Sequence, residues 1–296
     1  MNPRERGFLL LSSHLGNPER KVLSAPQLRV LAKRIANSMP DQKERDLVTE
    51  DLVALGYGGE MARRILELLE DEVLLAHYLR RGQKAGCVAL TRISTGYPLE
   101  VRKRLDLDSP ACLWAKGDLS LLERPKVALV GSRDLREPNR VFAREVGRQA
   151  ALQGFTLVSG NARGADKVAQ EACLEAGGSV ISVVADSLED KTARQNLLYL
   201  SEESFDEPFS AQRALSRNRV IHALGAMTFV AQCSYQTGGT WDGTVKNLRF
   251  RWSDVYCMDD GSDAASALMQ MGAKGITMAE LQDFCGLYHP EWNFLE

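Results

Sequence analysis

The sequence predicts an α/β protein with a doubly wound, mainly parallel sheet and a small helical domain ahead of it. From about residue 126 onward, short apolar runs alternate with segments of helical periodicity at the spacing of strand–helix units. The residues before about 84 show helical periodicity alone. Apolar runs of this kind suit strands that are buried on both faces and joined by right-handed crossovers. We therefore expect a helical domain over residues 1–84 and an α/β domain over residues 85–296.

The composition is that of an ordinary folded protein. Its 296 residues leave room for two modest domains, and the net charge of −2 gives no general attraction to nucleic acid. Six cysteines are scattered without a CxxC pair, which suggests free thiols in a reducing compartment. No apolar run approaches the ~20 residues of a membrane span, and the apolar patch at 8–11 is too short for a signal-peptide core. We expect a cytoplasmic protein that makes no membrane contact.

The N-terminal part contains helical segments separated by a glycine-rich turn. Residues 27–37 and 50–55 have helical periodicity, and Gly56-Tyr57-Gly58-Gly59 interrupts the pattern before it resumes. Helix–turn–helix pieces of this kind sometimes hold a DNA backbone, although plain antiparallel packing explains most of them. A strand over 87–91, a helix over 99–105 and a strand over 111–115 are then expected to lead into the main sheet.

The alternation after residue 126 gives the order of the remaining elements. The expected strands are residues 127–130, 155–159, 179–184, 227–231 and 255–258, and the expected helices are residues 139–152, 167–176, 192–200, 215–224, 244–251 and 264–271. Gly154 and Gly177 fall where helices should stop. The tail 275–296 has no clear pattern, although Trp292 and Phe294 suggest that it docks onto another part of the chain.

Three glycine-containing loops each follow a predicted strand and precede a helix. They are Gly131-Ser132-Arg133, the segment 159–166, and the segment 232–243 with Gly238, Gly239 and Thr240. The carboxyl ends of parallel strands lie at one edge of a sheet, where bare backbone amides and helix N-termini favour anions. Glycines are also frequent in ordinary tight strand-to-helix turns. The repetition, with hydroxyls and arginines among the glycines, favours an anion-binding site.

A second basic pattern opens the helix predicted over 215–224. Arg217 and Arg219 flank Asn218 at the start of an apolar helical run, and such a pair can grip phosphate oxygens. A solvated turn, or an internal ion pair with a carboxylate, is the alternative for this pattern. Arg140, Arg144 and Arg148 lie four residues apart on the outer face of their predicted helix, where a solvated surface is the simplest interpretation.

No catalytic arrangement can be assembled from the sequence. The four histidines lack metal-ligand spacing, and neither a GxSxG nor a GxxxxGK[ST] motif is present. Asp166 and Asp186 follow predicted strands and could act as bases, but capping a helix or orienting an arginine is the more common role. We expect a protein that is not an enzyme and that uses no metal and no cofactor.

Taken together, these motifs resemble the DNA-processing protein A (DprA, or Smf) family. The family's patterns are roughly VAIVGSR, VVSGxAxGID and RNRxI, and the chain follows them in order. The matching segments are residues 97–98, 113–117, 127–133, 158–166 and 217–221. The resemblance covers residues 97 to about 270. Three residues depart from the family patterns. Gln232 stands where the fourth strand of the family often ends in Glu, and Asn161 and Ala165 replace the more usual Leu and Ile of the second motif.

The resemblance implies an extended Rossmann-like fold that binds single-stranded DNA. It also implies loading of a RecA-type recombinase during natural transformation, in competent cells, and a homodimer. By analogy the phosphate-gripping pocket consists of Gly131, Ser132, Arg133, Arg217, Asn218 and Arg219, and is lined by Ser159, Gly160 and Arg163. Two alternatives remain within the wider superfamily: a nucleotide-sensing protein, and a phosphoribohydrolase-like enzyme with a PGGxGTxxE loop. Residues 236–244 match that loop weakly, and Lys246-Asn247 stands where its carboxylate is needed.

Overall fold

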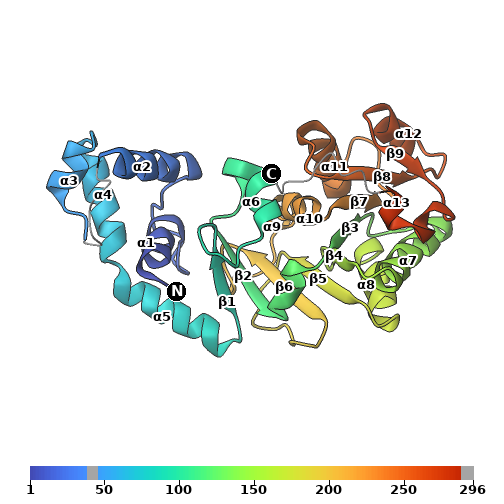
Figure 1. Ribbon diagram of the computed structural model, residues 1–296, viewed down its shortest axis with the longest axis horizontal. Helices are drawn as coiled ribbons and strands as arrows, with labels where there is room; N and C mark the ends of the chain where they lie inside the picture. Colours follow the sequence, from blue (N-terminus) through green and yellow to red (C-terminus); the bar gives the residue numbers. More distant parts are fainter. Residues whose placement is uncertain (39–45, 288–296) are drawn as a thin grey trace.

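The computed structural model describes residues 1–38 and 46–287. Within them one sheet of nine strands has the order β1-β2-β6-β5-β4-β3-β7-β8-β9 (Figure 1). The strands are β1 (Val88–Thr91), β2 (Cys112–Gly117), β3 (Lys126–Val130), β4 (Thr156–Ser159), β5 (Ser179–Val184), β6 (Leu197–Glu202), β7 (Met227–Val230), β8 (Asp254–Met258) and β9 (Lys274–Ile276). The pairs from β6 to β9 are parallel, whereas β2 runs antiparallel to both of its neighbours.

Helices cover both faces of the sheet and so confirm the doubly wound α/β class. Along β3, Val127 and Leu129 join the core beneath α7 (Glu137–Leu152) and α8 (Ala165–Glu175). Ala128 and Val130 face the opposite core, which includes α6 (Leu99–Leu105), α10 (Asn218–Leu224), α11 (Gly238–Phe250) and α12 (Asp263–Gln270). This alternation is why the strand shows a continuous apolar run: both of its faces are buried.

The chain reverses its direction of travel across the sheet between β3 and β7. From β3 it passes through α7 to β4, and from β7 it passes through α11, on the other face, to β8. The two strands are direct neighbours in register, with Val130 paired to Val230 at their carboxyl ends. In open parallel sheets such a switch point leaves a crevice outside the strand ends, where ligands bind. Figure 1 shows α11 and α12 above the sheet and α7 and α8 below it on this side of the molecule.

Five helices precede the sheet and lie at its opposite end (Figure 1). They are α1 (Pro3–Ser12), α2 (Ala25–Ser38), α3 (Thr49–Ala54), α4 (Gly59–Glu70) and α5 (Glu72–Lys84). Leu31, Leu52 and Ile65 belong to a core of their own. Tyr78 of α5 instead shares a core with Trp114 of β2. We call residues 1–84 the helical segment; its division from the rest as a separate domain stays a prediction.

Most predicted elements are present, and two predictions are wrong. The helix expected over 192–200 is absent, since residues 197–202 form β6, a strand held between β5 and β2. The helix expected over 215–224 is broken at Arg217 into α9 (Ala211–Ser216) and α10. The helix expected from Thr244 begins at Gly238. Docking of Trp292 and Phe294 lies outside the described residues.

The predicted surface features agree with the structure where it describes them. Arg140, Arg144 and Arg148 lie on the outside of α7, and each forms an ion pair with a glutamate. Within the described ranges, no helix combines the length and apolarity that crossing a membrane requires.

Candidate functional site

The first loop, residues 131–133, is fixed between the two neighbouring loops. The Ser132 amide donates to the Gln232 carbonyl at 2.9 Å, and the Ala165 amide donates to the Ser132 carbonyl at 3.1 Å. A side chain at Gly131 would not fit, since a Cβ there would lie 2.4 Å from that of Ala165. The glycine therefore allows the end of β3 to pack directly against the start of α8.

Gln232 explains one departure from the family pattern. Its Oε1 accepts the Arg136 amide at 2.9 Å, and its Nε2 donates to the Asp134 carbonyl at 3.1 Å. Glutamate could make the first contact but not the second, because a carboxylate has no proton to donate. The amide thus holds the loop after β3 against the end of β7.

The second loop, residues 160–164, wraps around the buried carboxylate of Asp166. Oδ2 of Asp166 accepts the amides of Gly160 and Ala162, both at 3.1 Å. Gly164 has a φ of +86°, and a Cβ there would lie 2.4 Å from the carbonyl oxygens of Ser132 and Arg133. Only glycine satisfies both conditions, so this residue interlocks the first and second loops.

Arg217 lies across the second loop and is the most unusual group of the site. Its side chain is 9% exposed, and its Nη2 is 3.8 Å from Oδ2 of Asp166. It lies so close to Gly160 that a Cβ there would come within 1.6 Å of Nη1. Among the described residues the guanidinium has no hydrogen-bond acceptor, and its Nε is buried without a partner. Asp166 opposes the charge of Arg217, but the buried N–H groups of the guanidinium still lack acceptors, which is costly, so this group can accommodate a ligand that brings acceptor oxygens.

Charges near Arg217 are set by burial and by neighbouring arginines. Burial raises the pKa of Asp166, and the positive charge of Arg217 opposes that rise. Burial, together with the charge of Arg217, lowers the pKa of His222 to about 3, so its imidazole is neutral at physiological pH. The positive charge of this edge therefore comes from arginines and not from His222.

Arg133 supplies a second cation at the same edge. It is exposed, and no hydrogen bond or ion pair holds its guanidinium within the part of the chain that the structure describes. Burial lowers the pKa of Arg217, and the positive charge of Arg133 lowers it further. The same charge opposes the rise that burial causes in the pKa of Asp166, so Arg133 lies close to both groups. Arg133 thus contributes positive charge from the solvent-exposed side of the site, and Arg217 contributes it from the buried side.

The third loop joins the other two at the start of α11. Thr240 Oγ1 donates to the Gly131 carbonyl at 3.1 Å, and Asn218 Nδ2 donates to the Gly239 carbonyl at 3.0 Å. Thr237, the N-cap residue of α11, supplies no side-chain cap, and the same holds at the starts of α7 and α8. Three helix N-termini without side-chain caps thus meet at the carboxyl ends of β4, β3 and β7, which favours negative charge there.

Three further residues predicted to form the pocket have side chains that are already bound to other parts of the protein. The guanidinium of Arg219 is paired with Glu202 at 3.1 Å and donates to the Asp108 carbonyl at 2.8 Å, so the internal ion-pair alternative describes it. The hydroxyl of Ser159 is buried and accepts Gln170 Nε2 at 2.6 Å. Arg163 lies at the rim, where it pairs with exposed Asp134. Ser159 and Arg219 therefore support the site from within.

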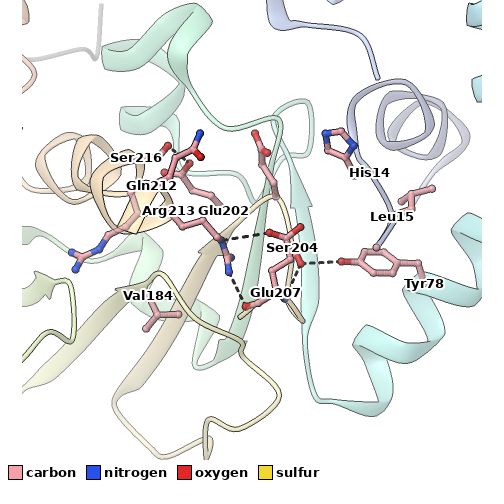
Figure 2. Close-up of a pocket in the computed structure, with 13 residues that line it drawn as sticks. His14, Leu15, Tyr78, Val184, Glu202, Ser204, Glu207, Gln212, Arg213 and Ser216 are labelled. Carbon is pink, nitrogen blue, oxygen red and sulfur yellow. Dashed lines mark hydrogen bonds and ion pairs between the residues drawn. The ribbon is translucent and has the colours of Figure 1, made fainter. Parts of the chain in front are cut away.

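Two hollows that the sequence did not indicate flank Arg217 and Asn218. One of about 160 Å³ adjoins Arg217. Figure 2 shows Tyr78 and His14 of the helical segment on one side of it, and Glu202 and Arg213 on the other. The second, of about 410 Å³, includes Asn218, Lys246 and half-exposed Phe250. The residues that line these two hollows are far apart in the sequence, so no local pattern could predict them.

Comparison with known proteins shows which family the chain resembles in sequence. A family model described as DNA recombination-mediator protein A matches residues 89–284. The chain is 31% identical over 188 residues to DNA processing protein DprA of Streptococcus pneumoniae, covering 58% of this chain and 66% of the relative. It is 30% identical over 189 residues to Protein Smf of Escherichia coli, covering 58% and 50%. The alignments thus span less than two thirds of these relatives.

Solved structures give the same fold. DNA processing protein A from Streptococcus pneumoniae superposes with a TM-score of 0.73 at 24% identity, covering 95% of this chain and 97% of that one. The protein of the same name from Helicobacter pylori, whose structure concerns its binding of single-stranded DNA, superposes with a TM-score of 0.58 at 25% identity. That match covers 69% of this chain and 97% of the other.

Proposed function

Because the chain belongs to the DNA recombination-mediator protein A family, we propose that it binds single-stranded DNA at the carboxyl edge of β3, β4 and β7. The observation that carries the proposal is the buried guanidinium of Arg217, which pairs with Asp166 at 3.8 Å but makes no hydrogen bond within the described residues. Phosphate oxygens of a strand supply the acceptors that Arg217 lacks, in the planar geometry that a guanidinium matches best. The similar protein from Helicobacter pylori, whose structure concerns its binding of single-stranded DNA, supports this choice of ligand.

A strand fits the site better than one small anion does. Exposed Arg133 and buried Arg217 can hold neighbouring phosphates, and the start of α11 adds backbone amides nearby. The hollow beside Arg217 and the second hollow, beside Asn218, leave space for neighbouring nucleotides. The contacts reach the sugar–phosphate backbone, so binding of many sequences is expected.

The remaining roles rest on the family resemblance. We propose that the protein acts in recombination of incoming DNA during natural transformation and hands the strand to a RecA-type recombinase. We propose also that it works as a cytoplasmic homodimer, binding DNA without breaking a bond and without a cofactor. Retention of a purified RecA-type recombinase on the immobilised protein–DNA complex tests the first of these roles.

The salt dependence of binding tests the proposed contacts. Two phosphate contacts, from Arg133 and Arg217, predict that the logarithm of the affinity falls with the logarithm of salt concentration at a slope of about −1.4 or steeper, at about 0.7 per contact. Fluorescence anisotropy of a labelled oligo(dT) over a salt series measures this slope. Affinity that does not change with salt would contradict a phosphate-gripping site.

A further inference from the structure

The connection between β6 and α9, residues 203–210, determines where Arg217 lies. α9 ends at Ser216, and the Arg217 amide donates to the Arg213 carbonyl at 3.0 Å. Arg217 is therefore carried at the end of a helix of less than two turns. Such a helix has little stability of its own, so its position depends on what holds the connection before it.

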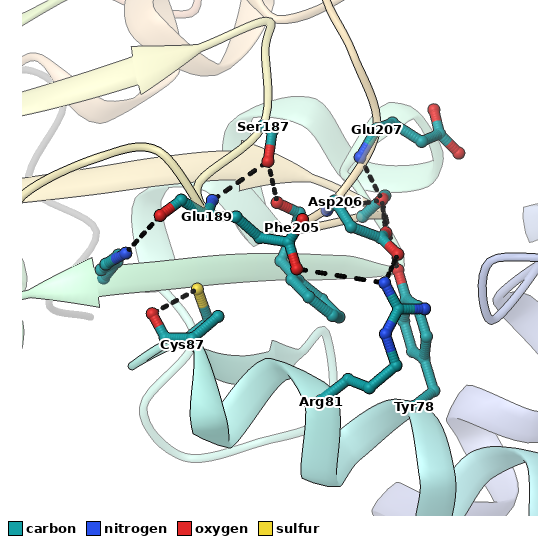
Figure 3. Close-up of polar contacts among 11 residues, drawn as sticks. Tyr78, Arg81, Cys87, Ser187, Glu189, Phe205, Asp206 and Glu207 are labelled. Carbon is teal, nitrogen blue, oxygen red and sulfur yellow. Dashed lines mark hydrogen bonds and ion pairs between the residues drawn. The ribbon is translucent and has the colours of Figure 1, made fainter.

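The helical segment holds the middle of this connection (Figure 3). Tyr78 Oη donates to Oδ1 of Asp206 at 2.7 Å, and the Arg81 guanidinium donates to Oδ2 at 2.9 Å. Next to them the ring of Phe205 is fully buried, with ring centroids 4.9 Å from Tyr78 and 4.7 Å from Trp114. Both carboxylate oxygens of Asp206 are thus bound by α5, while its neighbour is anchored in the shared core.

The attachment continues from Asp206 to α9 through Arg213. Its Nη1 donates to the Glu207 carbonyl at 2.7 Å, and its Nη2 donates to Ser201 Oγ at 2.8 Å. Figure 2 shows Arg213 between Glu207 and Glu202, with the hollow of about 160 Å³ separating this group from His14. Hydrogen bonds thus tie α5 to Asp206, and the next residue along the chain, Glu207, to the Arg213 side chain, while the Arg213 carbonyl accepts the backbone amide of Arg217.

We propose that Tyr78 and Asp206 are positioning residues for the DNA site, through which the helical segment sets the location of Arg217. This inference rests on the proposed function. It assigns to the helical segment a role that needs no DNA contact of its own. A small displacement of the connection moves α9, and the Arg217 guanidinium then no longer lies over Gly160.

The test measures oligo(dT) binding by the full chain carrying Tyr78→Phe or Asp206→Ala. Loss of one hydrogen bond changes an equilibrium by about twofold to tenfold, so we expect a weakening within that range. Tyr97→Phe is the matched control: Tyr97 is equally buried, and its hydroxyl donates to the Pro110 carbonyl at 2.8 Å. Asp206→Asn keeps an acceptor for Tyr78, and we expect it to recover part of the affinity.

A double-mutant cycle with Arg217→Ala separates positioning from general stabilisation. If Tyr78 acts through Arg217, Tyr78→Phe has no further effect on affinity in the Arg217→Ala background. Equal affinities for Tyr78→Phe and Tyr97→Phe, with both proteins folded by circular dichroism, overturn the positioning role alone. If Asp206→Ala does not fold, the two tyrosine variants decide. Failure of the unaltered chain to bind oligo(dT) instead refutes the proposed function, and the positioning role with it.

Discussion

Arg217→Ala is expected to weaken binding of single-stranded DNA by roughly tenfold to a hundredfold, because a hydrogen bond to a charged group contributes about 1.5–3 kcal/mol. The guanidinium is already buried and lies over Gly160, so little ordering remains when a phosphate arrives. The loss should be the same for oligo(dT) and oligo(dA), since phosphate contacts carry no sequence information. Anisotropy titrations of both oligonucleotides measure it.

Arg144→Ala is the matched control for this variant. It removes the same charge from the outer face of α7, where Arg144 pairs with exposed Glu175. The expected affinity of this variant is that of the unaltered protein. Loss of Arg217 removes the charge opposite buried Asp166 and so lowers the stability, although Asp166 keeps two backbone amides; a thermal melt checks that the variant is folded at the temperature of the titration. If the two variants bind alike, Arg217 is not a phosphate ligand.

Gly160→Ala is expected to weaken binding almost as much, although it removes no charge. The new Cβ would lie 1.6 Å from Nη1 and 2.1 Å from Cζ of Arg217, so the guanidinium must leave its place. The displaced cation no longer lies beside the amides of the second loop. Binding measured at low salt should show a loss of roughly tenfold or more, equivalent to at least one charge-assisted hydrogen bond.

Gly59→Ala controls for the general effect of adding a methyl group. Gly59 begins α4, and a Cβ there has no neighbour within 4 Å. This variant should bind as the unaltered chain does. Unchanged affinity in Gly160→Ala, at preserved stability, would mean that the position of Arg217 over the second loop does not matter for the ligand.

The sequence predicted the sheet well because its central strands are buried on both faces. Such strands appear as short apolar runs, as in β3, which ends just before Gly131, and in β5, which begins just after Gly178. β6 was missed because a helix was predicted over residues 192–200, which begins in the polar residues before the strand. The pairing of β6 with antiparallel β2 also depends on a distant part of the chain. The break at Arg217 was missed for a similar reason: nothing in the local periodicity interrupts the helical pattern there.

The site was predicted in part. The three glycine loops could be placed together, because parallel strands bring their carboxyl ends to one edge. The pattern Arg217-Asn218-Arg219 could not show which arginine faces the loops. That depends on Glu202 at the end of β6, which pairs with Arg219 and leaves Arg217 beside Gly160. The contact between Tyr78 and Asp206 joins residues 128 positions apart, so no local motif contains it.

The central claim is that the site around Arg217, at the carboxyl edge of β3, β4 and β7, binds a chain of phosphates. A competition experiment tests this claim most directly. Labelled oligo(dT) bound to the protein is challenged with unlabelled single strand, duplex or mononucleotide at equal nucleotide concentration. The account predicts that the single strand displaces the label, and that the mononucleotide and duplex displace it only weakly. Displacement by the mononucleotide as effective as that by the strand would contradict it and point to a nucleotide sensor.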